Sequence, residues 1–506
     1  MFPDINEKDD DMTDLVQGAR ELRDRLLQDR HRPTYHVIAP EGLCGPFDPN
    51  AAIFWKGRYH LMYIMQTEKG HCWAHVSSAD LVHWRHHSLA LEPGEGDTGI
   101  YSGGVFVDMN GTPTITYWGL GDEGGICLAT STDDDLEHWT KCPDNPVIVQ
   151  QEFGLSVGED GRPYGVADPS QIWIREGRYY MMTGNLLVLN KYGRGEEAIE
   201  EHKGDTTYLF VSDDLINWEY LHPFYESDRR WTDESEDDMC PDFFPLGDRH
   251  MLLFISHNLG CQYYIGRYED DHFYPELHER MTWVDASFFA PESLVDDKGR
   301  RIMWAWIHDC RSKESCEANG WSGTMSLPRV LSLGDDKTLR MAPPEELERL
   351  RYNPRERVSV SVPADGEVTL DDVSGDTIEL EIEMTAGSAV QYGVVVYRSP
   401  DGEEQTEVYY DAAEKKLKID TTRSSLGNEG PKSVEAGPLE LAPGEVLKLR
   451  VFLDRSVVEV FANDRQAVTR RIYTTRDDSV GVALFSRGGA AEAKASAWDM
   501  APANPW

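Results

Sequence analysis

The sequence contains no long apolar run and little positive charge. No stretch reaches the roughly 18 to 20 consecutive apolar residues that a membrane-spanning helix needs. The 506 residues hold 49 Lys and Arg against 90 Asp and Glu, which gives a formal net charge of -41 at pH 7. Nucleic-acid backbones and anionic membranes attract clustered Lys and Arg, so we expect neither as a partner. A neutral small ligand fits this composition better.

Paired cysteines and cofactor motifs are also missing. Eight Cys at irregular spacings, without a CxxC pair, favour reduced and mostly buried thiols over a disulfide framework, and we expect Cys310 and Cys316, the nearest pair, to be ordinary thiols. There is no HExxH, P-loop or dinucleotide glycine pattern, so we expect no metal and no cofactor. The opening MFPDINEKDDDM lacks the basic and apolar regions of a signal peptide, which predicts a cytoplasmic protein.

Two recurring elements indicate a repeated β-fold. An acid-Leu-x-x-Trp core appears in SSADLVHW (77–84), TDDDLEHW (132–139) and SDDLINW (212–218). Extended apolar segments also surround five turn glycines, about fifty to seventy residues apart: Gly57, Gly111, Gly177, Gly247 and Gly299. That spacing has room for a four-stranded sheet and predicts a five-bladed β-propeller, with the Trp units on outer strands that pack blade against blade.

The two ends of the chain have different patterns of apolar and polar residues. Beyond about residue 350, alternating segments such as TIELEIEMTA and VLKLRVFLDRSVVEVFAN predict an antiparallel β-sandwich. At the start, Met12, Leu15, Ala19, Leu22 and Leu26 have helical spacing before Pro33, which predicts a short helix docked on its own chain rather than a dimerising coil. We therefore expect an all-β protein with an N-terminal helical extension (1–32), a five-bladed propeller (33–350) and a β-sandwich (351–506).

Polar residues recur at one position of the predicted blades. Asp48, Ser102 and Asp168 each precede their turn glycine by nine residues, where the innermost strand of a blade reaches the channel mouth. Converging carboxylates suit glycosidic bond cleavage, which needs a nucleophile or base, a proton donor and a stabiliser of developing positive charge. The alternative is that Asp48-Pro49 and Asp168-Pro169 only form turns, but their shared register favours a site.

Several segments resemble glycoside hydrolase family 32, the invertase, fructanase and levanase family. They include GPFDPNAAIFWKGRYHLMY, GIYSGG, ADPSQIW, CPDFFPLGDRH, FAPESLVDDKGRRIMWAWI and, in the sandwich, LRVFLDRSVVEVFAND. The resemblance implies a propeller plus sandwich and a retaining mechanism that acts on fructofuranosides. It also implies that Asp48 is the nucleophile and Asp168 the transition-state stabiliser.

The sequence departs from the family pattern at three positions. Phe47 stands where the family has Asn, Ala167 where it has Arg, and Met239 where it has the general acid Glu. We consider three outcomes: Glu292 of the fifth blade supplies the proton, Asp238 supplies it, or nothing replaces the lost acid. Glu236 is also close, but neighbouring residues of a strand point to opposite faces.

The remaining candidates are sugar contacts, which use aromatic faces and polar side chains: Asn50, Trp55, Gln66, Trp73, Ser102, Asp242 and Trp306. Core packing is an equally good interpretation of each Trp. Two other functions stay open. One is an arabinofuranosidase-like propeller hydrolase, and the other is a catalytically silent carbohydrate-binding protein.

Overall fold

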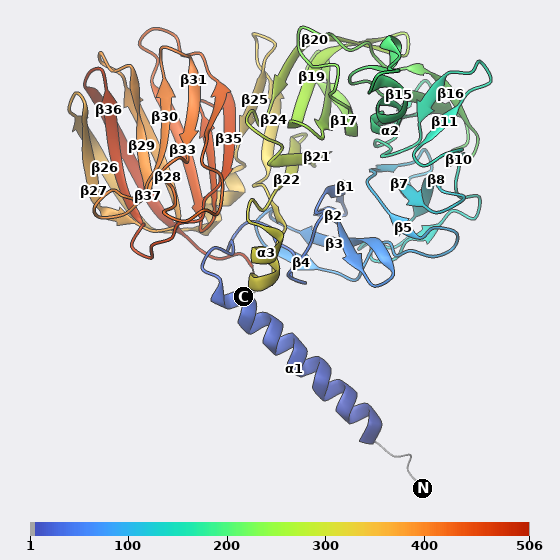
Figure 1. Cartoon of the computed structure of the whole chain (residues 1–506), viewed down its shortest axis with the longest axis horizontal. Coiled ribbons are helices and arrows are strands. Elements are labelled where there is room, and N and C mark those ends of the chain that lie inside the picture. Colours follow the sequence, from blue (N-terminus) through green and yellow to red (C-terminus); the bar gives the residue numbers. More distant parts are fainter. Residues whose placement is uncertain (1–5, 505–506) are drawn as a thin grey trace.

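The computed structural model describes residues 6–504, in which a propeller and a sandwich lie side by side (Figure 1). A long helix, α1 (Asn6–Gln28), extends away from both. None of the described helices is both long enough and apolar enough to cross a membrane. The all-β architecture expected from the sequence is confirmed.

Five antiparallel sheets of the described chain form the blades of the propeller. Blade 1 contains β1 (Pro49–Trp55), β2 (Arg58–Thr67), β3 (Gly70–Ser78) and β4 (Trp84–His86). Blade 2 contains β5 (Gly99–Ile100), β6 (Val105–Val107), β7 (Pro113–Leu120), β8 (Gly125–Thr130), β9 (Thr140–Lys141) and β10 (Ile148–Val149). A small hairpin follows, made of β11 (Leu155–Val157) and β12 (Pro163–Gly165).

The other three blades complete the ring. Blade 3 contains β13 (Trp173–Arg175), β14 (Arg178–Thr183), β15 (Tyr208–Ser212) and β16 (Trp218–Pro223), with α2 (Leu186–Val188), η1 (Leu189–Gly193) and η2 (Glu200–His202) between β14 and β15. Blade 4 contains β17 (Met239–Leu246), β18 (Arg249–Ser256), β19 (Gly260–Glu269) and β20 (His272–Arg280). Blade 5 contains β21 (Phe288–Val295), β22 (Arg301–Ile307), β23 (Thr324–Met325), β24 (Arg329–Leu333) and β25 (Leu339–Ala342), with α3 (Lys313–Asn319) between β22 and β23.

The acid-Leu-x-x-Trp units are one repeated turn at the outer strands, as the sequence predicted. In each unit the Leu has a positive φ, between 55° and 70°. The indole N–H then donates to the carbonyl oxygen of that Leu, at 3.2 Å for Trp84 and Leu81, and at 2.8 Å for Trp218 and Leu215. Trp84 also meets Trp304 of blade 5 edge to face, with ring centres 6.0 Å apart. The repeat therefore ends one blade and packs it on the next.

The sandwich follows the short helix η3 (Glu345–Leu350) and consists of two six-stranded antiparallel sheets. One contains β26 (Arg351–Val362), β37 (Ala491–Met500), β28 (Thr377–Thr385), β33 (Leu447–Asp454), β34 (Val457–Ala462) and β35 (Gln466–Arg471). The other contains β27 (Gly366–Ser374), β36 (Gly481–Arg487), β29 (Gln391–Arg398), β30 (Thr406–Asp411), β31 (Lys416–Asp420) and β32 (Val434–Pro438). Aliphatic residues from both sheets fill one core between them.

A buried ion pair joins the propeller to the sandwich. Arg329 of β24 donates to Glu459 of β34 at 2.8 Å, and both side chains are fully buried. The backbone N–H of Leu327 donates to the same carboxylate at 2.6 Å, and the ring of His36 lies 3.3 Å from it. These contacts satisfy a buried charge, which would otherwise be costly.

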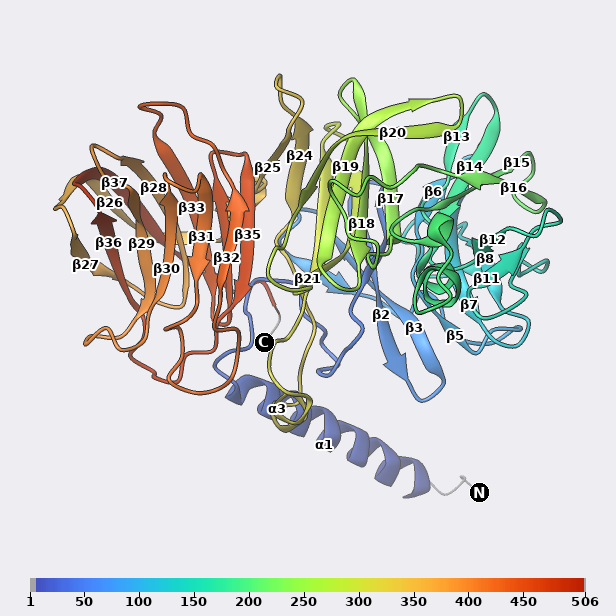
Figure 2. The same ribbon diagram turned by 45° about the horizontal axis from the view of Figure 1, so that its top comes forward.

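The predicted N-terminal helix docks on its own chain only near its C-terminal end. Leu26 is buried, and the Arg25 guanidinium donates to the carbonyl oxygen of Ala318, which is part of α3 (Figure 2). Leu15 is 65% exposed, so the rest of the chain does not cover the apolar face of this helix along its whole length. The side chain of Met12 lies outside the part of the chain that is described.

Candidate active site

A cavity of about 270 Å³ lies where the inner strands of all five blades converge. Its polar side chains come from blades 1 to 4, and aromatic rings form much of the remaining wall. The lining residues are Pro46, Asp48, Tyr101, Ser102, Trp118, Phe153, Asp168, Leu186, Leu187, Met239, Cys240, Ile255, His257, Phe289 and Trp306. Charged and apolar surface thus meet in one small space, as in sites that bind small ligands.

The three residues predicted from their common register lie together in this cavity. Asp48 precedes β1, Ser102 lies between β5 and β6, and Asp168 lies between β12 and β13. Ser102 Oγ donates to Asp48 Oδ2 at 3.2 Å, so blades 1 and 2 are linked at the cavity. Asp48 Oδ1 has no hydrogen-bond partner among the described residues. One carboxylate oxygen is therefore held by Ser102, and the other is buried without a hydrogen-bond partner among the described residues.

Burial and neighbouring negative charges disfavour the charged forms of both aspartates. Burial raises the pKa of Asp48 to about 7, with a further contribution from the negative charge of Asp168. The pKa of Asp168 is raised to about 6, again chiefly by burial, while His257 and a hydrogen bond from the Cys240 thiol lower it. Strongly perturbed carboxyl groups in a cavity are typical of catalytic sites.

The fourth blade presents sulfur to the cavity rather than a carboxylate. Met239 and Cys240 open β17 and both line the cavity, and the Cys240 thiol lies 3.5 Å from Asp168 Oδ2. A β-bulge between Met239 and Asp242, with Cys240 at a positive φ of 50°, lets these adjacent residues share the cavity wall. A thioether has no proton to give, so Met239 cannot act as an acid.

Two of the carboxylates that precede Met239 have structural partners. Glu236 is buried and forms a two-pronged ion pair with Arg280 at 2.8 Å, and Gln262 adds a hydrogen bond at 3.2 Å. Asp237 is fully buried and accepts from His257, as described below. Neither carboxylate lines the central cavity.

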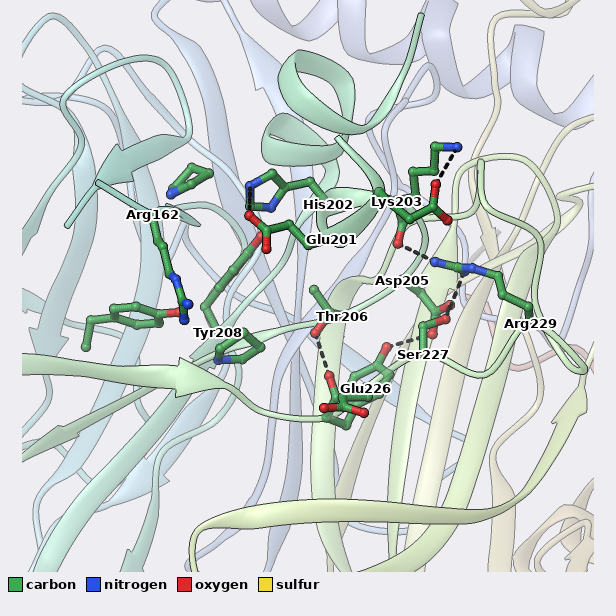
Figure 3. Close-up of a pocket in the computed structure, with 15 residues that line it drawn as sticks. Arg162, Glu201, His202, Lys203, Asp205, Thr206, Tyr208, Glu226, Ser227 and Arg229 are labelled. Carbon is green, nitrogen blue, oxygen red and sulfur yellow. Dashed lines mark hydrogen bonds and ion pairs between the residues drawn. The ribbon is translucent and has the colours of Figure 1, made fainter. Parts of the chain in front are cut away.

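Asp238 belongs to a different network, which leads to a second cavity of about 370 Å³ (Figure 3). The Tyr225 hydroxyl lies 2.8 Å from Asp238 and 2.9 Å from Asp205, and Tyr225 and Asp205 both line that cavity. One hydroxyl carries one proton, so two acceptors need a protonated carboxyl, and burial raises the pKa of Asp238 well above its usual value. The prediction that Asp238 replaces the lost acid finds no support in this placement.

Glu292 lies behind the cavity wall. Its carboxylate accepts from the Ala52 backbone N–H at 3.1 Å and from the Gln171 amide at 3.3 Å. Burial raises its pKa well above the usual value, and the neighbouring charge of Asp242 adds to the shift. Asp242 is fully buried, accepts from Ser293 and is stabilised by Arg301. Neither Glu292 nor Asp242 lines the cavity, so their predicted roles as acid and sugar contact gain no support.

Comparison with known proteins identifies the family. The model of the "Glycosyl hydrolases family 32 N-terminal domain" matches residues 36–343, and that of the "Glycosyl hydrolases family 32 C terminal" matches residues 346–499. The chain belongs to glycoside hydrolase family 32. It is a β-fructofuranosidase-like glycoside hydrolase, and the resemblance seen in the sequence is confirmed.

Known members of family 32 are similar over nearly the whole chain. A sucrose-6-phosphate hydrolase of Zymomonas mobilis is 28% identical, over 95% of this chain and 94% of its own length. A fructan 1-exohydrolase of Bromus pictus is 30% identical, over 84% and 79%. The crystal structure of fructan 1-exohydrolase IIa from Cichorium intybus has a TM-score of 0.80 at 22% identity, over 94% of this chain and 98% of that one, and shares the fold.

Two of the three departures from the family 32 pattern are core residues. Phe47 is fully buried and packs on Tyr63, with ring centres 4.7 Å apart, and Ala167 is also fully buried. Neither lines the cavity, whereas Met239 does. Of the three departures, the one at Met239 is therefore the one that lies on the cavity wall.

The predicted sugar contacts of this family 32 chain divide into two groups. Ser102 and Trp306 line the central cavity, and Gln66 lines an adjoining cavity of about 640 Å³ that shares Trp306. The other candidates line neither of these two cavities. Asn50 holds the Asp48 carbonyl oxygen at 2.8 Å, Trp73 is fully buried with its indole N–H on the Tyr101 carbonyl oxygen at 3.2 Å, and Trp55 lies at the far end of β1.

Sequence analysis missed His257, which lines the cavity. Its Nδ1 lies 2.7 Å from Asp237 Oδ2, and its backbone N–H donates to Asp237 Oδ1 at 3.1 Å. A usable signal was present, because a hairpin that pairs Met239 with Ile255 places Asp237 opposite His257 two residues further along.

Proposed function

We propose that the chain is a retaining hydrolase of fructofuranosides, with Asp48 as nucleophile and Asp168 as stabiliser of the transition state. The observation that carries this proposal is the pair of aspartates in one cavity, with Asp48 Oδ1 unpaired among the described residues and Oδ2 held by Ser102. A buried carboxylate with a free oxygen is costly unless a ligand engages it. The family membership and the names of the relatives support a fructoside as that ligand.

We assign the two roles as the resemblance to family 32 implies. Asp48 attacks the anomeric carbon, and the sugar is transferred to the enzyme. Asp168, which precedes the first strand of blade 3, stabilises the positive charge that develops on the ring and binds sugar hydroxyls. Water then releases the sugar with the original configuration.

The wall of the cavity favours an uncharged sugar. Among the described residues that line it there is no Lys or Arg, and the aromatic rings of Trp118, Tyr101 and Phe289 offer apolar faces. Sugars place their C–H faces on such rings, while their hydroxyls need the polar groups at the cavity floor. A phosphate group on the bound sugar unit would find no Lys or Arg among these residues.

A substrate panel with three proteins tests the proposal. Wild type, Asp48→Asn and Asp168→Asn are incubated with sucrose, a fructan oligosaccharide and an aryl arabinofuranoside, and the released sugars are identified. We expect fructose release by wild type and a loss of kcat of at least roughly 10³-fold in both variants. Asp122→Asn, an exposed loop residue, is the matched control. Arabinose release without fructose release would instead identify an arabinofuranosidase.

A silent carbohydrate-binding protein is the second candidate, and Met239 favours it, because the position of the family acid holds a thioether in the cavity. This function predicts saturable binding of a fructoside by calorimetry with no product after long incubation. Turnover of any fructoside that depends on Asp48 would exclude it.

A further inference from the structure

The cavity needs a proton donor that is not a carboxylic acid at the family position. Sugar alkoxides are poor leaving groups, so the departing oxygen must take up a proton. Both cavity aspartates already have roles in the proposed function, and Met239 has no proton to donate. Of the other described lining residues, the one that titrates near neutral pH by its chemistry is His257.

His257 is held rigidly by a buried carboxylate. Asp237, which is fully buried, accepts both from the backbone N–H of His257 at 3.1 Å and from ring atom Nδ1 at 2.7 Å. Two bonds to one carboxylate fix the orientation of the ring and assign the Nδ1–H to Asp237. Nε2 is then the ring nitrogen that remains for a ligand, and 45% of the side chain is exposed.

The imidazole occupies the neighbourhood of the lost acid. Met239 pairs with Ile255 across β17 and β18, and both side chains line the cavity. His257 follows Ile255 by two residues, in the turn directly after β18, and it lines the same cavity. Phe289 of blade 5 contacts the ring edge to face, with ring centres 5.6 Å apart, and limits its movement.

The surrounding charges favour the protonated imidazole. Burial by itself lowers the pKa of His257, but the hydrogen bond to Asp237 and the negative charges of Asp237, Asp168 and Asp48 raise it above the usual value. His308 is the neighbouring group whose charge would oppose this, and burial lowers its own pKa to about 4, which leaves it neutral.

Two more groups lie near the His257–Asp237 pair. Arg194 lies 3.9 Å from Asp237 Oδ1, so a cationic side chain is close to that carboxylate. The Cys240 thiol also lines the cavity, and burial raises its pKa well above the usual value, which keeps it neutral. The charged neighbours of His257 are thus mainly anionic.

We propose that His257, oriented by Asp237, is the proton donor that replaces the carboxylic acid of the family. This inference rests on the proposed function. As Asp48 forms a bond to the anomeric carbon, the bond from that carbon to the glycosidic oxygen breaks and its electron pair stays on the oxygen. That oxygen takes the proton from Nε2 and leaves as an alcohol. In the second step the neutral Nε2 accepts a proton from water, the water oxygen attacks the anomeric carbon, and the Asp48 carboxylate is released.

Substrates that differ in their need for a proton test the assignment. Sucrose loses an alkoxide, whereas β-fructofuranosyl fluoride loses fluoride, which departs without an acid. For His257→Gln we expect kcat/KM for sucrose to fall roughly 10²–10⁴-fold and that for the fluoride to fall less than about tenfold. Gln retains an amide donor for Asp237, so the fold is maintained. His250→Gln, on the same hairpin, is the control and should change both values less than about twofold.

A second variant distinguishes a positioning role of Asp237 from a purely structural one. Asp237→Asn removes the charge that raises the pKa of His257, so the high-pH limb of the kcat/KM profile for sucrose should move to lower pH. A purely structural role for Asp237 would lower activity at all pH values without moving that limb.

The outcomes are distinct. A wild type that hydrolyses neither sucrose nor the fluoride overturns the proposed function and this inference with it. An active wild type in which His257→Gln loses both substrates equally, or neither, overturns the inference alone. Selective loss of sucrose hydrolysis in Glu292→Gln, with His257→Gln unaffected, would assign the proton to Glu292.

Discussion

Ser102 Oγ donates to Asp48 Oδ2 at 3.2 Å, and this bond crosses from the second blade to the first. It lowers the pKa of a carboxyl group that burial and Asp168 raise. Ser102→Ala removes the donor, so the pKa of Asp48 should rise further and less of the nucleophile should be ionised at low pH. We expect kcat/KM to fall roughly tenfold or more at pH 6 and less at pH 8.

A pH profile of kcat/KM for wild type and Ser102→Ala measures this. Ser212→Ala is the control, because Ser212 is equally buried but lies in an outer turn of blade 3. An equal loss at both pH values would mean that the bond does not control ionisation.

Asp48 should reduce stability at high pH. Its pKa is about 7 in the folded protein, above the unfolded value of about 3.9, so the folded state binds the proton more tightly. The stabilisation is complete below about pH 4 and is lost as the pH rises through about 7. Asp48→Asn should therefore raise Tm at pH 8 by roughly 2 °C, with a smaller gain at pH 4.5. Calorimetry decides this, and a lower Tm for the variant at pH 8 would show that the charged carboxylate is stabilised in the fold.

Trp306 should contribute to sugar affinity, whereas Trp55 should not. Trp306 lines the central cavity, where its ring can pack on the C–H face of a bound sugar. We expect Trp306→Ala to raise KM for sucrose about tenfold, which corresponds to about 1.4 kcal/mol. Trp55 is the last residue of β1, next to the turn that leads into β2. Trp55→Ala should therefore leave KM within about twofold. Equal effects on KM in both variants would contradict the assignment of Trp306 to the sugar-binding wall of the cavity.

The Arg329–Glu459 pair should be important for stability. Both side chains are fully buried at the boundary of the propeller and the sandwich. Arg329→Met leaves Glu459 without its cation and should cost about 3–5 kcal/mol, whereas the double variant Arg329→Met with Glu459→Met should cost less. The exposed pair Lys337–Asp248 provides the control, because Lys337→Met should cost at most about 1 kcal/mol. Urea unfolding followed by tryptophan fluorescence measures all three, and an Arg329→Met effect no larger than the control would contradict the role of the pair.

Local turn chemistry made the propeller predictable from the sequence. The five glycines used to count blades all adopt a positive φ, between 62° and 84°, which glycine tolerates and most residues avoid. The acid-Leu-x-x-Trp units are self-contained, since the acid and the indole bond within a few residues. Counting back nine residues from the glycine also located Asp48, Ser102 and Asp168 in the cavity.

The rest of the site depended on irregular backbone that the sequence does not mark. Nine residues before Gly247 stands Asp238, but the bulge at Cys240 turns Met239 and Cys240 toward the cavity instead. Ala51, Cys240 and Ala290 have positive φ in the inner strands without being glycine. His257 directly follows the returning strand β18, so the signal for it is the pairing of β17 with β18, which sets it opposite Asp237, and not a local motif.

The role of Asp48 as nucleophile is tested most directly by trapping the sugar on the enzyme. Wild type is mixed with β-fructofuranosyl fluoride, quenched rapidly in acid and digested, and the peptides are analysed by mass spectrometry. We predict a peptide that carries one fructosyl unit on Asp48, and no such adduct in Asp48→Asn. Turnover by wild type without an adduct, or an adduct on another residue, would contradict the account.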